Sequence, residues 1–176
     1  NKGFDGEISD ICTGSGCIAI ALAVHLTEAR IYASEISSAA LKTAMENALE
    51  NNADITFYRS DILKQQPHQL PVSDIIVSNP PYVRNSERMQ MRKNVMLYEP
   101  PEALFVQDED PLIFYRAILE AASQSLRPGG KVYFEINEAL GREINDLMKS
   151  NGYSDVSILK DIRGRDRIAK GRKNDR

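Results

Sequence analysis

Short apolar runs alternate along the chain with longer segments that have helical periodicity or helical end signals. Runs rich in Ile, Val, Tyr and Phe predict five strands, at 7–12, 30–34, 55–58, 74–78 and 131–136. The longer segments predict four helices, at 17–25, 38–51, 111–126 and 139–150. Two last runs, 154–159 and 167–169, are joined by a short turn around Gly164 without a helix, which predicts an antiparallel pair.

Strands that alternate with helices are typical of a parallel sheet that is covered on both faces. We therefore expect one α/β domain, doubly wound, with an antiparallel strand at its C-terminal end. In the second helix Leu41, Ala44, Met45, Ala48 and Leu49 have helical spacing, and Ser37 or Ser38 is expected to cap it. The segment 127–130 (Arg-Pro-Gly-Gly) predicts a turn, and the tail 170–176 is expected to fray.

The composition is that of a globular domain, with 42% hydrophobic and 27% charged residues. A net charge of -3 does not favour a surface that binds phosphates over the whole molecule, so direct nucleic-acid binding is not expected. The two cysteines, Cys12 and Cys17, form neither a disulfide framework nor a metal-ligand set, which favours a reducing, cytoplasmic setting and no metal. No apolar run is long enough to cross a bilayer, and no membrane partner is expected.

A glycine-rich turn, Thr13-Gly14-Ser15-Gly16, lies between the first strand and the first helix. Glycines there allow a tight turn and the close approach of a ligand, and open α/β sheets bind ligands beyond the carboxyl ends of their strands. Glu35 ends the second strand, where a carboxylate can accept both hydroxyl hydrogens of a ribose. Asp61 follows the third strand and could accept the amino group of adenine. Together these residues predict a nucleoside-cofactor site.

The identity of the cofactor stays open at this point. The residues from Gly14 to Ala19 also satisfy G-x-G-x-x-A, a form of the dinucleotide fingerprint, so a nicotinamide oxidoreductase is one candidate. The turn could also be purely structural, and Asp61 alone would more often be a turn residue or a helix cap.

The stretch Val77-Ser78-Asn79-Pro80-Pro81-Tyr82 makes a rigid corner straight after the fourth strand, because neither proline has an N–H with which to continue a ladder. If the cofactor is S-adenosylmethionine, the Asn79 side-chain oxygen and the Pro80 carbonyl could grip the two N–H bonds of a planar nitrogen. They would stabilise the charge that develops on that nitrogen, while Tyr82 packs on the flat face of the group. The structural alternative is a proline-rich loop with a capping Asn.

Four segments, DICTGSGCIAIALA, SDIIVSNPPYV, YEPPEALF and GRDRIAKGR, together resemble the protein-(glutamine-N5) methyltransferases of the HemK type. These enzymes modify the glutamine in the Gly-Gly-Gln loop of class I peptide release factors. The N-P-P-Y element is shared with amine methyltransferases that act on DNA or RNA, whereas the segments 98–104 and 164–167 narrow the resemblance to the glutamine group.

The resemblance implies a class I S-adenosylmethionine-dependent methyltransferase fold, Rossmann-like, with a mostly parallel seven-stranded sheet and an antiparallel C-terminal strand. It implies that S-adenosylmethionine is bound by Asp10, Thr13, Gly14, Ser15, Gly16, Glu35, Ile36, Asp61, Ile62 and Asn79. It assigns the substrate amide to Asn79, Pro80, Pro81, Tyr82 and Glu99, with Asn79, Pro80 and Tyr82 as the catalytic group. The implied partner is a class I peptide release factor.

Two departures from the family pattern matter. Relatives usually carry an N-terminal helical domain that helps to hold the release factor, so we expect residues 1–176 to be the catalytic domain of a longer protein and to methylate poorly alone. Cys12 stands where the usual D-x-G-x-G-x-G turn has its first glycine. A cysteine is small and readily buried, so both cysteines are expected to be packing residues.

The loop 83–101 is long and basic, and it either folds over the substrate peptide or is a solvated linker. Glu135 and Asn137 end the fifth strand near the expected site and receive no role. The alternatives to methylation of a release factor are methylation of a ribosomal-protein glutamine, amine methylation of adenine or guanine in nucleic acid, a nicotinamide oxidoreductase, and a non-catalytic binding module.

Overall fold

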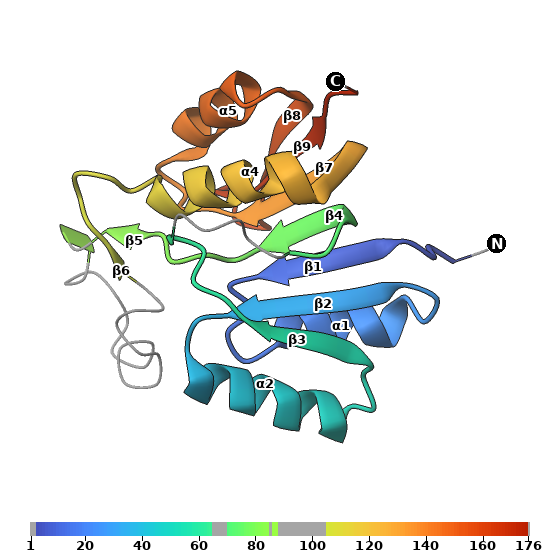
Figure 1. Cartoon of the computed structure of the whole chain (residues 1–176). Helices are drawn as coiled ribbons and strands as arrows, with labels where there is room; N and C mark the ends of the chain where they lie inside the picture. The colour runs from blue at the N-terminus through green and yellow to red at the C-terminus, as the bar shows by residue number, and fades with distance from the viewer. Residues whose placement is uncertain (1–2, 65–69, 85, 88–104, 176) are drawn as a thin grey trace.

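The computed structural model describes residues 3–64, 70–84, 86, 87 and 105–175. Its centre is a seven-stranded sheet with helices on both faces (Figure 1). The strands of this sheet are β1 Glu7–Ile11, β2 Arg30–Glu35, β3 Ile55–Arg59, β4 Ser73–Ser78, β7 Leu126–Glu135, β8 Tyr153–Lys160 and β9 Asp166–Lys173. The helices are α1 Cys17–His25, α2 Ser38–Glu50, α4 Ile113–Ser125 and α5 Gly141–Ser150. A separate parallel pair consists of β5 Val83–Arg84 and β6 Phe105–Val106.

The strand order is β3-β2-β1-β4-β7-β9-β8. Strands β3, β2, β1, β4 and β7 are parallel, and β9 pairs antiparallel with both β7 and β8. The expected α/β fold, with a mostly parallel seven-stranded sheet and an antiparallel C-terminal strand, is therefore confirmed. The chain progresses outward from β1 in one direction and from β4 in the other, so the topological switch point lies between these two strands.

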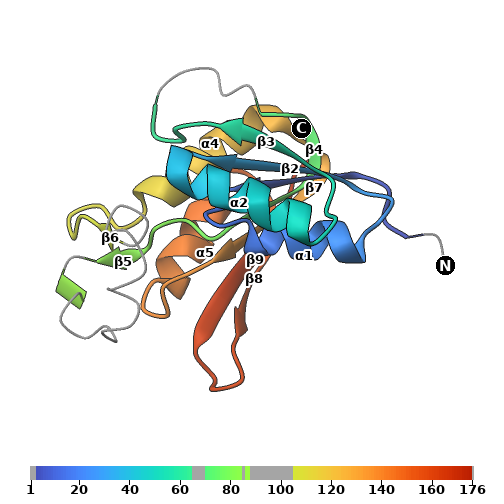
Figure 2. The same ribbon diagram turned by 90° about the horizontal axis from the view of Figure 1, so that it is seen from below.

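The alternation of side chains along β1 and β4 builds one core on each face of the sheet. On one face Ile8 packs with Ala19 of α1, and on the other face Ile11 and Ile76 pack with residues of α4 and α5. The buried residues of α4 follow the helical period, with Tyr115, Ile118, Leu119 and Ala122 on its inner side. Figure 2 shows α1 and α2 on the same side of the sheet, with the β8–β9 hairpin extending beyond them.

For α2 the structure confirms the expected serine cap and part of the expected apolar stripe. Ser37 caps α2, since its Oγ accepts a hydrogen bond from the Ala40 N–H at 3.3 Å. Ala44 and Ala48 are buried, whereas Met45 and Leu49 are exposed. Leu41 is half-buried.

The turn expected at 127–130 appears as a bulge inside β7. The register with β4 shifts there, from Ser73 opposite Leu126 to Ile75 opposite Lys131, and Gly129 has a φ of 73°. A Cβ on Gly130 would lie 2.9 Å from the Asp74 carbonyl oxygen, so only glycine fits beside β4 there. The expectation that the tail 170–176 frays is wrong, because β9 continues its ladder with β7 through Lys173. The Lys173 ammonium donates to three carbonyl oxygens at the end of α4, those of Ala122, Ser123 and Leu126.

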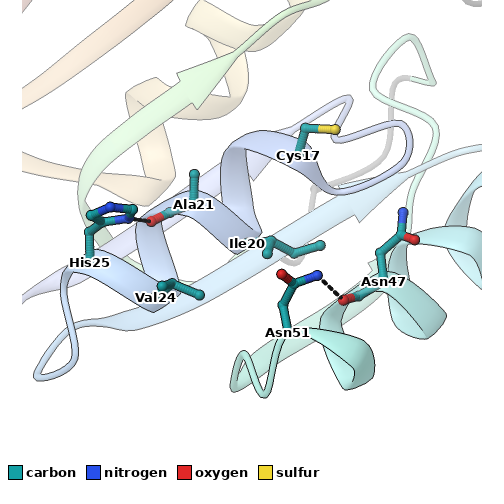
Figure 3. Close-up of a pocket in the computed structure, with 7 residues that line it drawn as sticks. All are labelled: Cys17, Ile20, Ala21, Val24, His25, Asn47 and Asn51. Atoms are coloured by element: carbon teal, nitrogen blue, oxygen red, sulfur yellow. Dashed lines mark hydrogen bonds between the residues drawn. The ribbon is translucent and has the colours of Figure 1, made fainter.

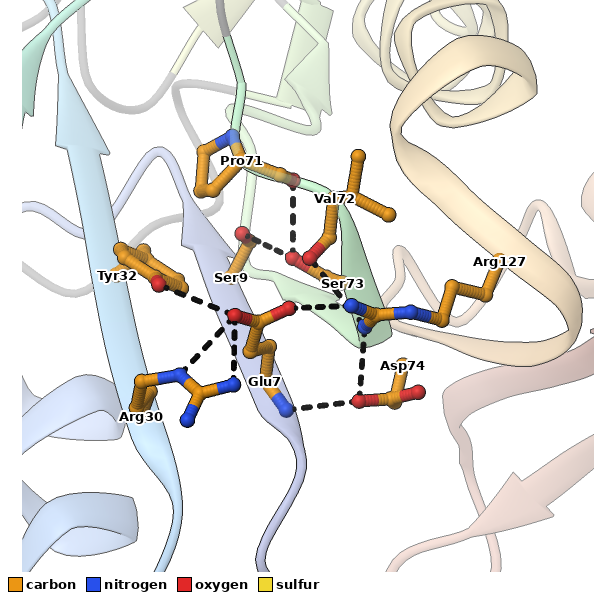
Figure 4. A network of polar contacts seen from close by, with 9 residues as sticks. All are labelled: Glu7, Ser9, Arg30, Tyr32, Pro71, Val72, Ser73, Asp74 and Arg127. Atoms are coloured by element: carbon orange, nitrogen blue, oxygen red, sulfur yellow. Dashed lines mark hydrogen bonds and ion pairs between the residues drawn. The ribbon is translucent and has the colours of Figure 1, made fainter.

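A group of charged side chains, the amino-edge network, joins the amino ends of β1, β2 and β4 to the start of β7 (Figure 4). Its members are Glu7, Arg30, Asp74 and Arg127. Glu7 accepts from Arg127 at 2.7 Å and pairs with Arg30 at 2.9 Å, and Asp74 pairs with Arg127 at 3.0 Å. The Arg127 hydrogen bond is the main reason that the pKa of Glu7 lies below its usual value.

Among the described residues, no helix combines the length and the apolar character that crossing a membrane requires.

Candidate active site

The carboxyl ends of β2, β1 and β4 lie side by side at the switch point. Ile11 pairs with Ser34 on one side and with Ser78 on the other. The Ser78 hydroxyl donates to the Ile11 carbonyl oxygen at 2.5 Å, and the Thr13 N–H donates to the Ser34 carbonyl oxygen at 3.0 Å. The glycine-rich turn is thus fastened to both neighbouring strands, and Asn79 follows directly beside it.

The turn contains three residues in the left-handed region, with φ of 62° at Cys12, 57° at Gly14 and 86° at Gly16. Gly16 is tightly packed, since an added Cβ would lie 3.1 Å from the Ala44 Cβ. Around Gly14 the space is open, and no described atom lies within 4 Å of an added Cβ. The turn therefore packs its second glycine on α2 and leaves its first glycine accessible to a ligand.

Cys12 adopts the left-handed conformation although it carries a side chain, and its side chain packs against the larger core. Burial raises the pKa of the Cys12 thiol to about 12, so the thiol stays protonated and a poor nucleophile at neutral pH. The structure describes Cys12 and Cys17 as free cysteines. The packing role expected for Cys12 fits these observations, whereas Cys17 is exposed.

Asp10 is 1% exposed and ties the turn to α1. Its Oδ2 accepts from the Thr13 hydroxyl at 2.6 Å and from the Ala19 N–H at 3.2 Å. Its Oδ1 is buried and has no hydrogen-bond partner within the described part of the chain. Because burial disfavours the charged form, the pKa of Asp10 rises to about 7. An unsatisfied buried carboxylate oxygen is costly, and such atoms are typical of functional sites.

Glu35 lies across the turn from Gly14, as expected. Its Oε2 accepts from the Gly14 N–H at 3.1 Å. Its Oε1 accepts from the N–H groups of Ile36 and Ser37, each at 2.9 Å. A carboxylate has about four acceptor positions, so Oε2 retains capacity for a further donor.

The residues predicted to bind the adenine end of the cofactor, Asp61 and Ile62, are less available to a ligand than Glu35 is. Asp61 follows β3, where the Ser60 N–H donates to the Glu35 carbonyl oxygen at 3.0 Å. Its carboxylate accepts from the Leu63 N–H at 3.1 Å and lies 3.4 Å from the Lys64 ammonium, so Asp61 also serves its own turn. Ile62 is 6% exposed and belongs to the larger core, so its side chain does not face outward.

The Asn-Pro-Pro-Tyr corner follows β4 directly. Asn79 is exposed, and its side chain makes no hydrogen bond to any described residue. Pro80 and Pro81 are buried. Tyr82 is half-buried, and its hydroxyl donates to the Glu135 Oε1 at 2.8 Å. The corner thus exposes the side-chain amide of Asn79 next to two buried, rigid prolines.

Sequence reasoning missed the contacts of Glu135 and Asn137 with this corner. The Asn137 side-chain amide donates to the Tyr82 carbonyl oxygen at 3.3 Å. A signal was present, because β7 pairs with β4 and the ends of neighbouring parallel strands lie together. Glu99, predicted to bind substrate, lies outside the described residues, as does the loop 83–101 except for 83, 84, 86 and 87.

A shallow hollow between α1 and α2 borders the glycine-rich turn, since the Asn47 side-chain amide donates to the Ser15 carbonyl oxygen at 3.0 Å (Figure 3). It is lined by Cys17, Ile20, Ala21, Val24, His25, Asn47 and Asn51. None of them is a predicted site residue, so this hollow is not the candidate site. Among the residues that the structure describes, no group of three or more His, Cys, Asp or Glu side chains could hold a metal ion.

The strand order and the cluster of turn, acid and corner at the switch point define a class I methyltransferase fold. Residues 1–107 match the model of the methyltransferase small domain family, and the chain belongs to this family. S-adenosylmethionine is the cofactor that this membership implies.

Two relatives named release factor glutamine methyltransferase match nearly the whole chain. The one from Bacteroides thetaiotaomicron is 51% identical over 92% of this chain and 58% of its own length. The one from Flavobacterium psychrophilum is 49% identical over 93% of this chain and 57% of its own length. The chain therefore spans less than two thirds of these relatives. They confirm the resemblance drawn from the four sequence segments.

A solved structure supports the fold. The crystal structure of a methyltransferase from Pyrococcus furiosus superposes with a TM-score of 0.74 at 20% identity, covering 99% of this chain and 78% of its own. At this level of identity the likeness concerns the fold alone.

Proposed function

We propose that residues 1–176 are the catalytic domain of a protein-(glutamine-N5) methyltransferase that acts on a class I peptide release factor. The observation that carries this proposal is the exposed amide of Asn79 on a rigid corner beside a glycine-rich turn. The names of the two relatives support the glutamine substrate.

Three observations fit S-adenosylmethionine as the cofactor. The space around Gly14 is open, so a ligand can approach the backbone closely. Glu35 is fixed across the turn and keeps acceptor capacity for ribose hydroxyls. Asp10, beside the same turn, has a buried oxygen with no hydrogen-bond partner among the described residues. When bound, S-adenosylmethionine supplies an activated methyl group on a sulfonium.

The corner would hold and activate the glutamine amide. The Asn79 side-chain oxygen and the Pro80 carbonyl each accept one N–H of the amide nitrogen, so its lone pair is aimed at the methyl group. During transfer of the methyl group from the sulfonium to the amide nitrogen, both acceptors would stabilise the positive charge that develops on nitrogen. The nitrogen then loses one proton to solvent. Tyr82 packs against the planar amide and limits its orientation.

The other candidate substrates are less well supported. Amine methylation of adenine or guanine would use the same corner, but the two relatives described above are named release factor glutamine methyltransferases. A glutamine of a ribosomal protein could be methylated by the same mechanism. We also propose a cytoplasmic setting, which the two free cysteines support.

The test is transfer of a labelled methyl group from S-adenosylmethionine to a release factor and to a Gly-Gly-Gln peptide. Asn79→Ala is expected to lower the rate about 10²–10³-fold, as loss of one transition-state acceptor does. Asn51→Ala, which removes an exposed amide at the C-terminal cap of α2, is the matched control and should keep the wild-type rate. Transfer to DNA or ribosomal RNA instead, or no transfer by the wild-type chain at high concentration, would contradict the proposal.

A further inference from the structure

Tyr82 is held at two points by the end of β7, and neither contact has a role in the reaction described above. Its hydroxyl donates to Glu135 and its carbonyl oxygen accepts from Asn137. We infer that Glu135 and Asn137 are positioning residues of the proposed methyl transfer: they fix Tyr82, and through Tyr82 the orientation of the Pro80 carbonyl. This inference rests on the proposed function.

The carboxylate of Glu135 is itself held in place. The Glu135 backbone carbonyl accepts from the buried Tyr115 hydroxyl at 3.0 Å, which fixes the end of β7 on α4. Arg167 of β9 lies 3.5 Å from the Glu135 carboxylate and 3.4 Å from the Tyr82 hydroxyl. Burial and the nearby Glu135 charge raise the pKa of Tyr82 above its usual value. The Tyr82 hydroxyl therefore stays neutral and remains a hydrogen-bond donor.

The orientation of the Asn137 amide follows from its three contacts. Its Oδ1 accepts from the Ala139 N–H at 2.9 Å. Its NH₂ group therefore points to the Tyr82 carbonyl oxygen and to the Glu87 carboxylate, 2.8 Å away. Glu87 is also bound by the Arg84 side chain at 2.7 Å. Asn137 thus joins both the corner and the residues that follow it to β7.

The side-chain contacts of Glu135 contribute little that the fold itself requires. The end of β7 is already paired with β9, and the Ile136 N–H donates to the Arg167 carbonyl oxygen at 2.9 Å. The side chains of Glu135 and Arg167 are 29% and 36% exposed, and ion pairs with such exposure stabilise a fold only weakly. Catalysis is more sensitive, because a displacement of about 1 Å can cost about 10²-fold in rate. The contacts therefore serve to position Tyr82 precisely rather than to stabilise the fold.

The test is steady-state kinetics with a Gly-Gly-Gln peptide and S-adenosylmethionine. Tyr82→Phe and Glu135→Ala are each expected to lower kcat about 10-fold with little change in the peptide KM, and the double variant should lose no more than either alone. Glu135→Gln keeps an acceptor for the Tyr82 hydroxyl and should restore kcat to within about 3-fold of wild type. Asn137→Asp replaces the donor with a carboxylate oxygen facing two acceptors, and should lower kcat about 10-fold as well.

Glu138→Gln is the matched control. Glu138 pairs with Arg165 at 3.2 Å near the same edge, so its kcat should equal wild type. Calorimetric binding of S-adenosylhomocysteine should be unchanged in every variant, since none of these residues belongs to the glycine-rich turn.

The outcomes separate the inference from the proposed function. If the wild-type chain is active and Glu135→Ala keeps its kcat, or changes KM alone, the inference is overturned. Additive losses in the double variant overturn it too, because Glu135 would then act independently of Tyr82. If the wild-type chain forms no methylglutamine, the proposed function fails and the inference falls with it.

Discussion

The acids at the two ends of β1 and β2 have different kinds of partner. At the amino edge every carboxylate of the network meets a guanidinium, and Arg127 bridges Glu7 and Asp74. At the carboxyl edge the contacts of Asp10 and Glu35 are with backbone N–H groups and a hydroxyl. One oxygen of Asp10 has no partner there among the described residues.

The difference indicates where the molecule is stabilised and where it is prepared for a ligand. At the amino edge the carboxylates of Glu7 and Asp74 are already paired with arginine side chains. The carboxyl edge combines left-handed backbone at Cys12 with an unsatisfied buried acid and an exposed amide at Asn79. Such features cost stability and persist where binding offsets them. The following changes test this contrast, from the largest expected effect to the smallest.

Asp10→Asn should stabilise the unliganded chain by about 2–3 kcal/mol at pH 8. The neutral amide oxygen can keep both bonds from Thr13 and Ala19, and no buried charge remains. The folded-state pKa of Asp10, about 7, lies above the unfolded value, so native Asp10 retains its proton longer as pH rises. Stability due to Asp10 is therefore complete at low pH and is lost as pH rises toward 7 and beyond.

Urea denaturation at pH 5 and at pH 8 measures this effect. The gain in Asp10→Asn should be larger at pH 8 than at pH 5, because most of the window between the unfolded pKa and the folded pKa of about 7 lies above pH 5. An equal effect at both pH values would mean that the charge of Asp10 is not the cause.

Gly16→Ala should destabilise the chain by about 2 kcal/mol, because the new Cβ meets the Ala44 Cβ and the backbone stays left-handed. Gly14→Ala is the matched control, with a similar φ and open surroundings, and should cost only about 1 kcal/mol. Chemical denaturation compares the two. A larger loss at Gly14 would contradict the packing described for the turn.

Glu7→Gln should destabilise the chain by about 1 kcal/mol at neutral pH, since two ion pairs of an exposed network are weakened. The pKa of Glu7 is depressed in the folded state, so its contribution is present above the unfolded pKa and is lost as pH falls through the folded value. The amino edge should thus lose stability in acid, whereas the Asp10 contribution behaves in the opposite way. A pH series of thermal unfolding curves for both variants shows whether the signs differ.

The sequence predicted those features that depend on local pattern. The strand–helix alternation gave the sheet, and the spacing from Gly16 to Glu35 brought an acid to the glycine-rich turn, since both lie at the ends of adjacent parallel strands. The rigid corner at Asn79 followed from its two prolines.

The features it missed depend on residues far apart in the chain. Glu135 meets Tyr82 across 53 positions, and no local pattern encodes that contact. The order of the tail depends on the pairing of β9 with β7. Asp61 shows a limit of another kind. A carboxylate at a turn can accept a hydrogen bond from its own backbone or from a ligand, and the residue type is the same in both cases.

The most direct test of the account is a calorimetric titration of S-adenosylhomocysteine into wild type, Glu35→Gln and Glu7→Gln. These two glutamates lie at opposite edges of the sheet, one at the end of β2 and the other at the start of β1. The account predicts that Glu35→Gln weakens binding by about 1–3 kcal/mol while Glu7→Gln leaves the affinity unchanged. Binding that is indifferent to Glu35, or binding of NADH in place of S-adenosylhomocysteine, would contradict the assignment of the carboxyl edge as a methyltransferase site.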